Sequence, residues 1–331
     1  MGADALSDVL RAVRLTGAVF FNLDVKAPWV AETPSAAQCV PYVMPDTGHL
    51  IEYHVITRGT CWAGLTDGEP VQLHAGDIIV FPQGDAHVLS SEPGMRFPPD
   101  MAHFTGAEKA QLPFVLQFGG DGPDEAGVVC GFLGCDARPF NPLLTALPRF
   151  IHLPATSPHR STWLNHIVHA AVDESVNKRS GGEGVLGRLS ELMFIEVVRS
   201  YIQTLSAEET GWLAGLADKH VAAALNAMHG NPAHAWTLEE LARLAGLSRS
   251  AFAERFTEVL GQPPIQYLTA WRMQLATGLL AGGKDSIARV AAQVGYESEA
   301  AFSRAFKKLI GSPPAEWRRA HAARKSKVET D

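Results

Sequence analysis

The spacing of apolar residues predicts strands in the first third of the chain. Short runs rich in β-branched and aromatic residues, such as 51–56, 61–65, 71–73 and 78–81, are separated by glycine, proline and aspartate. Runs of this length and composition at close spacing are typical of an antiparallel sandwich or barrel. We therefore expect a β-rich domain at the start of the chain.

Helical periodicity begins after Pro142. Apolar residues recur at three- to five-residue steps through 163–174 and 183–205, which is the pattern of amphipathic helices that bury one face. Two adjacent helices of this kind can pack on each other or on a second copy of the chain, and we expect them to form a homodimer. From Leu216 onward the whole sequence is helix-like.

A duplicated segment is the strongest pattern in the second half. Residues 238–264 and 287–314 match at an offset of 49 up to a shared glycine and at an offset of 50 from a shared serine onward. The second copy therefore carries one extra turn residue. Each copy contains a short apolar helix pattern, the glycine, the serine, two phenylalanines four positions apart and a Gly-x-Pro-Pro ending.

The residue types in each copy predict a helix-turn-helix. Gly246 and Gly295 can adopt the left-handed backbone conformation that ends a helix. Ser248 and Ser298 are suited to cap the amino end of the helix that follows. Phenylalanines four apart lie on one helix face, where they hold the second helix against the first. The sequence therefore predicts two helix-turn-helix units in tandem.

The two-copy pattern with its Gly-x-Pro-Pro endings resembles the AraC/XylS family of transcription regulators over about 216–319. The resemblance implies a linker helix over 264–279 that holds both units, so that two recognition helices enter successive major-groove segments about 34 Å apart. It also implies double-stranded DNA and RNA polymerase as partners. An activator is the expectation, with repression as the alternative.

The predicted N-caps place the first turns of the two recognition helices. Arginine bonded to guanine is the commonest specific base contact, so Arg304 is the predicted base-reading residue. Phosphate contacts are expected from Arg249, Lys307 and Lys308. The first recognition helix has few hydrogen-bonding side chains and is expected mainly to position the protein. The whole predicted interface comprises Arg249, Ser250, Ala253, Glu254, Glu299, Ala300, Ser303, Arg304, Lys307 and Lys308.

A second motif lies in the first half of the chain. Residues 76–87 place a strand between a glycine turn and a Pro-x-Gly turn, with His87 at the start of the next strand. This resembles the second motif of cupin barrels and implies a cupin-type sensor domain. The His-x-His of metal-binding cupins is reduced here to His54 alone. The two histidines can face one cavity, with a metal ion as the corresponding cofactor hypothesis, or be hydrogen-bonded residues of the barrel.

Cysteines are the remaining candidates for chemistry. Cys130 and Cys135 enclose two glycines, and three interpretations stay open: buried apolar residues, a redox pair, or thiolates that join Cys61 and the histidines on a metal ion. Five fully extended residues span about 17 Å, so a disulfide would need the backbone to fold back. The candidate effector or redox residues are His54, Cys61, His87, Cys130 and Cys135.

Composition and charge agree with an intracellular protein that meets a polyanion through its second half. The chain is 46% hydrophobic and 19% charged, enough to bury a core, and it has neither a membrane-spanning apolar run nor the start of a secretory signal. Residues 1–215 carry 13 basic and 24 acidic side chains, whereas 216–331 carry 15 and 11. We expect a cytoplasmic protein whose basic half contacts DNA.

Together the patterns predict an α+β chain in four parts: an antiparallel cupin-like sensor barrel over 1–155, a helical linker and dimerisation segment over 156–212, a DNA-binding domain over 213–320 and a flexible tail over 321–331. The predicted function is not enzymatic. It is sequence-specific regulation of transcription, with a barrel that senses a small effector, a redox signal or a metal. The alternative is a cupin-type metal-dependent enzyme fused to a DNA-binding domain.

Overall fold

In the computed structural model the described residues are 4–45, 47–101, 112–136, 140–177, 179–206, 208–283 and 285–320. They separate into two compact units, of which one contains 15–136 and 147–204 and the other contains 1–14, 137–146 and 205–331. The expected flexible tail lies outside the described residues. The unit that contains both sheets is called the sensor unit below, and the other is called the helical unit.

The division differs from the expected domains in two respects. Residues 1–14 and 137–146, expected in the sensor domain, belong to the helical unit. The helices expected as a linker belong instead to the sensor unit, since its second segment runs to Thr204. Both differences arise from contacts between residues far apart in the sequence, which local periodicity does not contain.

In the described part of the sensor unit, ten strands form two sheets. The strands are β1 (Thr16–Lys26), β2 (Val30–Thr33), β3 (His49–Arg58), β4 (Thr60–Leu65), β5 (Val71–His74), β6 (Ile78–Phe81), β7 (His87–Ser90), β8 (Phe114–Gly119), β9 (Glu125–Cys135) and β10 (Ile151–Leu153). The six-stranded sheet has the order β10-β6-β3-β9-β1-β8, and the four-stranded sheet has the order β2-β7-β4-β5.

The sheets do not close into the expected antiparallel barrel. No strand in the described part of the chain is shared between them, and β8 pairs with β1 in parallel rather than antiparallel fashion. The outer edge of β1 is thus taken by β8, and the outer edge of β6 is taken by β10. Because these edges are already hydrogen-bonded, they are not available to the four-stranded sheet. The fold is an open two-sheet sandwich.

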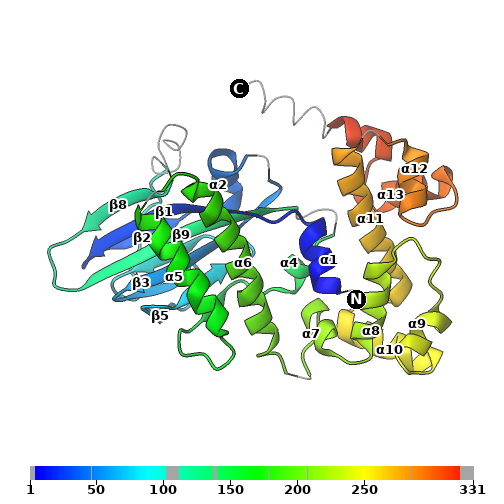
Figure 1. Ribbon diagram of the computed structural model, residues 1–331, viewed down its shortest axis with the longest axis horizontal. Helices are drawn as coiled ribbons and strands as arrows, with labels where there is room; N and C mark the ends of the chain where they lie inside the picture. The colour runs from blue at the N-terminus through cyan, green and yellow to red at the C-terminus, as the bar shows by residue number, and fades with distance from the viewer. Residues whose placement is uncertain are drawn as a thin grey trace. The chain divides into compact units, whose positions relative to one another are not determined.

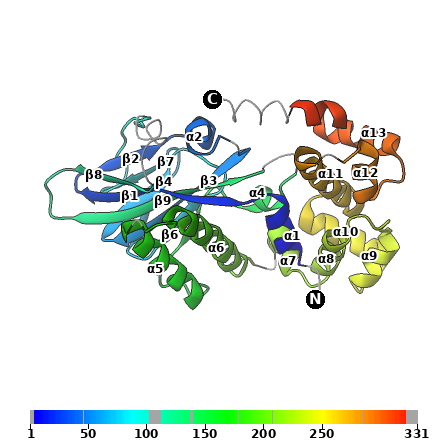
Figure 2. The same ribbon diagram turned by 45° about the horizontal axis from the view of Figure 1, so that its top comes forward.

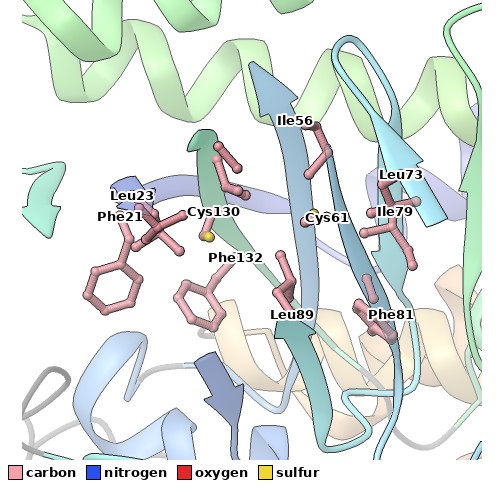
Figure 3. Packing of buried hydrophobic residues seen from close by; sticks show 14 of the residues in the cluster. Phe21, Leu23, Ile56, Cys61, Leu73, Ile79, Phe81, Leu89, Cys130 and Phe132 are labelled. Carbon is pink, nitrogen blue, oxygen red and sulfur yellow. The ribbon is translucent and has the colours of Figure 1, made fainter. Parts of the chain in front are cut away.

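The core of the sensor unit lies between the inner faces of the two sheets (Figure 3). Successive side chains of a strand point to opposite faces, so alternate residues of β1 and β9 enter this core. The residues labelled in Figure 3 are Phe21, Leu23, Ile56, Cys61, Leu73, Ile79, Phe81, Leu89, Cys130 and Phe132. The burial of these side chains removes apolar surface from water and stabilises the sandwich.

Two helices, α5 (Thr162–Asn177) and α6 (Gly182–Ile202), cover the other face of the six-stranded sheet (Figure 1). The hydroxyl groups of Tyr53 on β3 and Ser190 on α6 are 2.5 Å apart, in a buried hydrogen bond. At Gly17 on β1 and Gly187 on α6 the two backbones meet so closely that a Cβ at either position would lie 2.4–2.6 Å from the other's carbonyl oxygen. The apolar stripe of α6 is therefore used against the sheet.

The helical unit is built around α11 (Pro264–Gly282), with one helix pair near each of its ends (Figures 1 and 2). One pair is α9 (Leu238–Leu244) and α10 (Arg249–Leu260), and the other is α12 (Ile287–Gln293) and α13 (Glu299–Ile310). The described residues of this unit also form α1 (Ala5–Ala12), α4 (Pro142–Ala146), α7 (Trp212–Ala217) and α8 (Val221–Gly230). Helix α2 (Ala36–Val43) belongs to the sensor unit.

A buried hydrogen-bond chain centred on Tyr267 connects three elements of the helical unit. The indole N–H of Trp212 donates to the Tyr267 hydroxyl at 2.7 Å, and that hydroxyl lies 2.6 Å from Nε2 of His229. Burial lowers the pKa of His229 to about 3, so its ring is neutral. Because the Tyr267 oxygen already accepts from Trp212, its O–H is placed to donate a hydrogen bond to Nε2. Phe140, just before α4, stacks edge-on against Tyr267 and donates its backbone N–H to Gln274.

None of the helices in the described residues is long and apolar enough to cross a lipid bilayer.

The contact between β1 and α6 predicts opposite effects of one substitution at two positions in the same helix. Gly187→Ala should destabilise the sensor unit by about 1–3 kcal/mol, because the new methyl group would overlap the backbone of β1. Gly184→Ala, at an exposed position with open space around its Cβ, should stabilise the helix by up to about 1 kcal/mol. Urea unfolding followed by circular dichroism measures both. Equal effects would show that the close approach does not hold.

Candidate functional site

The duplicated segments form the two expected helix-turn-helix units. Gly246 and Gly295 have φ of 67° and 82°, in the left-handed region that glycine adopts without strain. The Ser248 hydroxyl accepts the backbone N–H of Ala251, and the Ser298 hydroxyl accepts that of Ala301. Both predicted turn glycines and both predicted N-caps are confirmed.

The phenylalanine pairs fix the orientation of the two recognition helices α10 and α13. Phe252, Phe256, Phe302 and Phe306 are fully buried, with ring centroids 5.6 Å apart in the first pair and 5.5 Å apart in the second. The opposite faces carry the predicted interface. Its exposed residues are Arg249, Ser250, Glu254, Glu299, Ala300, Arg304, Lys307 and Lys308, whereas Ala253 and Ser303 are half-buried.

The arginines of α10 already have acidic partners within the helical unit. Arg249 forms an ion pair with Glu239 of α9 at 3.0 Å. Arg255 donates to Asp218 at 2.9 and 3.0 Å and to Glu258 at 2.8 Å. These carboxylates lower the positive potential that α10 presents to a polyanion. The sequence-based expectation that α10 mainly positions the protein is consistent with this charge balance.

The charges on α13 are arranged differently. Arg304, Lys307 and Lys308 are exposed and form no ion pair within the described residues. One acidic residue, Glu299, accompanies them on this helix. The second recognition helix therefore carries cationic side chains that are available for the phosphates and base edges of a duplex.

The sensor unit contains a cavity of about 280 Å³ between its sheets. Its walls come from both sheets and from the segment that follows β7. The described lining residues are Phe21, Leu23, Val30, Ala31, Glu32, Thr33, Glu52, His54, Leu89, Phe97, Pro98, Asp100, Leu116, Phe118, Cys130, Gly131 and Phe132. A concave, mostly apolar cavity with a few polar groups is the usual form of a small-molecule site.

Three ionisable side chains form a buried cluster beside this cavity. Nε2 of His54 lies 2.7 Å from Nε2 of His87, and Nδ1 of His87 lies 2.9 Å from the carbonyl oxygen of Asp85. Glu52 Oε2 is 3.7 Å from Nε2 of His87, beyond hydrogen-bond distance. Both carboxyl oxygens of Glu52 and Nδ1 of His54 are buried without a hydrogen-bond partner. Of the two histidines, His54 lines the cavity and His87 does not, and each is hydrogen-bonded to the other.

Burial sets the protonation of this cluster. Loss of water disfavours charged forms, so the pKa of Glu52 lies well above its usual value. The pKa of His54 lies well below its usual value, and that of His87 is lowered to about 4. Burial therefore favours the uncharged form of each of these three side chains.

The candidate cysteines are not brought together as a set. Cys130 and Cys135 are both on β9, five residues apart and hence on opposite faces of the strand, so a disulfide between them would require β9 to be rebuilt. Cys130 lines the cavity and Cys61 lies in the same core cluster. Burial raises the pKa of Cys61 and Cys135 to about 12 and that of Cys130 well above its usual value. Reactive thiols need the reverse, exposure and a lowered pKa.

The comparison with known proteins assigns both units. A cupin family model matches residues 4–203, and a helix-turn-helix domain model matches residues 241–320. A putative AraC-like transcription regulator of Streptomyces lividans is 32% identical over 96% of this chain and 98% of its own length. The chain belongs to the AraC-like transcription regulators. It is a DNA-binding regulator of transcription with an amino-terminal cupin domain.

Two further proteins are similar to this chain. The regulator AlkR of Acinetobacter baylyi is 29% identical over 95% of this chain and 99% of its own. A crystal structure of the AdpA DNA-binding domain in complex with a target DNA is 31% identical, covers 33% of this chain and 97% of its own, and has a TM-score of 0.32.

Glu52 is the residue of this AraC-like regulator that the sequence analysis missed. It lies two positions before His54 on β3, in a run that is otherwise mostly apolar and aromatic. An acidic residue on the core-facing side of a strand is rare without a partner, and that was the available signal. The described residues hold no group of three or more His, Cys, Asp or Glu side chains placed to bind a metal ion, and the metal hypothesis stays a prediction.

The charges on α13 predict that two variants lose affinity for DNA in different ways. Arg304→Ala should weaken binding to a site selected from random DNA by about 1–3 kcal/mol and leave unrelated DNA nearly unaffected, because it removes a base contact. Lys307→Ala should weaken both to the same extent and lower the salt slope by about one, because it removes a phosphate contact. Titrations by fluorescence anisotropy at several salt concentrations measure both. Equal losses on both DNAs for Arg304→Ala would make Arg304 a phosphate contact.

Proposed function

We propose that this AraC-like regulator binds a small-molecule effector in the cavity of its sensor unit and thereby changes how its recognition helices bind DNA. The observation that carries the proposal is Glu52, which is 1% exposed and lines the cavity with both carboxyl oxygens unpaired. Leaving a buried polar group without a partner costs free energy. A bound ligand that supplies the missing partner gives this arrangement a function.

The path of the chain supports a direct route from the cavity to the helical unit. Strands β1 and β9, which both line the cavity, pair side by side at Thr16 and Gly134. Along the chain beyond these paired ends, Arg14 and Phe140 belong to the helical unit. A ligand that shifts the two strands therefore acts on both connections at once. This route replaces the expected transmission through the helices of 159–205, since α5 and α6 pack within the sensor unit.

We also propose a homodimer that acts together with RNA polymerase. Val185 and Leu192 are 47% and 42% exposed and lie seven positions apart on α6, hence on one face. Exposed apolar side chains on one helix face suit an isologous contact between two copies. RNA polymerase is the partner through which a promoter-bound regulator of this family would activate transcription.

The enzyme alternative has less support. The relatives that match nearly the full length of this chain are described as transcription regulators. We therefore propose a non-enzymatic sensor, in which His54 and His87 position the polar end of the cavity.

Footprinting of the full-length protein on its own upstream region and on an unrelated promoter tests the proposed function. We expect protection of two neighbouring major-groove segments about one helical turn apart, which survives an excess of bulk competitor DNA. Uniform binding that the competitor abolishes would contradict sequence-specific regulation.

The dimer proposal predicts that Leu192→Glu sediments as a monomer in analytical ultracentrifugation, whereas the unmodified protein sediments as a dimer. A charge buried in an apolar interface costs more than the contact contributes. Leu309→Glu is the matched control, since Leu309 is 47% exposed and lies on α13. A dimer that persists in Leu192→Glu, or that is lost equally in Leu309→Glu, would place the interface elsewhere.

A further inference from the structure

The hydrogen-bond network fixes which atoms at the polar end of the cavity accept hydrogen bonds. The carbonyl oxygen of Asp85 can only accept, so Nδ1 of the neutral His87 carries the proton and donates to it. Nε2 of His87 is then an acceptor, and Nε2 of His54 must donate to it. Nδ1 of His54 is left as an unprotonated acceptor without a partner. Both oxygens of Glu52 also lack a partner. In the carboxylate form of Glu52, which a bound cation would favour, the cavity end holds three unused acceptor atoms.

The charged residues around the cavity have one sign. The described lining contains three carboxylic acids and no lysine or arginine, the acids being Glu32, Glu52 and Asp100. Arg96, which is not part of the lining, donates to both oxygens of Glu32 at 2.8 Å. An anionic ligand would therefore meet no lysine or arginine of the described lining, whereas a cation would stabilise the ionised form of Glu52.

The remaining wall is apolar and rich in aromatic rings. Four phenylalanines, Phe21, Phe97, Phe118 and Phe132, line it together with leucine, valine and alanine side chains. Aromatic faces attract cations and also bury apolar groups. The cavity of about 280 Å³ has room for a small molecule that carries both a charged end and an apolar body.

We propose that the effector is an amphipathic organic cation, whose N–H groups donate to Glu52 and His54 while its apolar body lies among the phenylalanine rings. The proposal rests on the proposed function, because it takes this cavity as the effector site. A protonated primary amine has three N–H donors, which matches the three unused acceptors. A quaternary ammonium has the charge but no donor, and a carboxylate has neither.

Isothermal titration of the full-length protein with four matched probes tests this chemistry. The probes are 4-phenylbutylamine, 4-phenylbutan-1-ol, 4-phenylbutanoate and trimethyl(4-phenylbutyl)ammonium, which share one apolar body. Charge-assisted hydrogen bonds to a buried carboxylate should make the amine bind about tenfold to one-hundredfold more tightly than the alcohol. The trimethylammonium probe should bind more weakly than the amine, and the carboxylate should bind most weakly.

Substitution of the Glu52 carboxyl group separates its contribution to ligand affinity from the contribution of the apolar wall. Glu52→Gln keeps the shape but cannot become a carboxylate when a cation binds, so the affinity for the amine should fall about tenfold or more. The affinity for the alcohol should stay within about twofold. Glu174→Gln is the matched control, since Glu174 is also buried in the sensor unit but does not line the cavity. That variant should bind all four probes as the unmodified protein does.

Three results would overturn the proposal: no binding of the amine, binding of the carboxylate as tight as that of the amine, or an unchanged amine affinity in Glu52→Gln. The comparison of the four probes on the unmodified protein does not depend on how any variant folds. A footprint on the same preparation separates the two ideas. Specific DNA binding without amine binding would reject the ligand class alone, and loss of specific DNA binding would reject the proposed function itself.

Discussion

The antiparallel pairing of β1 with β9 is the constraint on which the rest of the molecule depends. It runs from Thr16 opposite Gly134 to Lys26 opposite Glu125. Its inner face supplies one wall of the cavity, and its outer face receives α6 at Gly17. Where the pairing ends, the chain enters the helical unit from both strands. One set of backbone hydrogen bonds thus joins the cavity, the packing of the sheet on its helices and the chain connections to the helical unit.

The DNA-binding half could be predicted from the sequence almost completely, because its determinants are local. Gly246 and Ser248 lie two positions apart and fix one turn, and the phenylalanine spacing fixes the packing of the next helix. Because the same glycine, serine and phenylalanine pattern occurs in both copies, a chance match to a helix-turn-helix was improbable. The helices α1 and α4 were missed as parts of the helical unit because the contacts that place them, such as Ala5 with Asn226, join residues far apart in the sequence.

The sensor half was predicted in part. The strand runs followed from alternation, and the cupin-like motif singled out His54 and His87 without showing that they contact each other. The open sandwich did not, because the parallel addition of β8 depends on a long segment without periodic pattern. Cys130 and Cys135 drew notice as a closely spaced pair, yet an extended strand separates their side chains. Glu52 was not among the candidate residues, although burial without a partner makes it the most informative residue of the cavity.

Thermodynamic reciprocity gives the most direct test of the central claim, that the cavity and the recognition helices are coupled. If an amine bound at Glu52 changes the affinity for DNA, bound DNA must change the affinity for the amine by the same factor. The measurement is the dissociation constant of 4-phenylbutylamine for the free protein and for the protein saturated with its specific site. The account predicts a difference of about fivefold or more. Equal constants, with both ligands bound specifically, would contradict it.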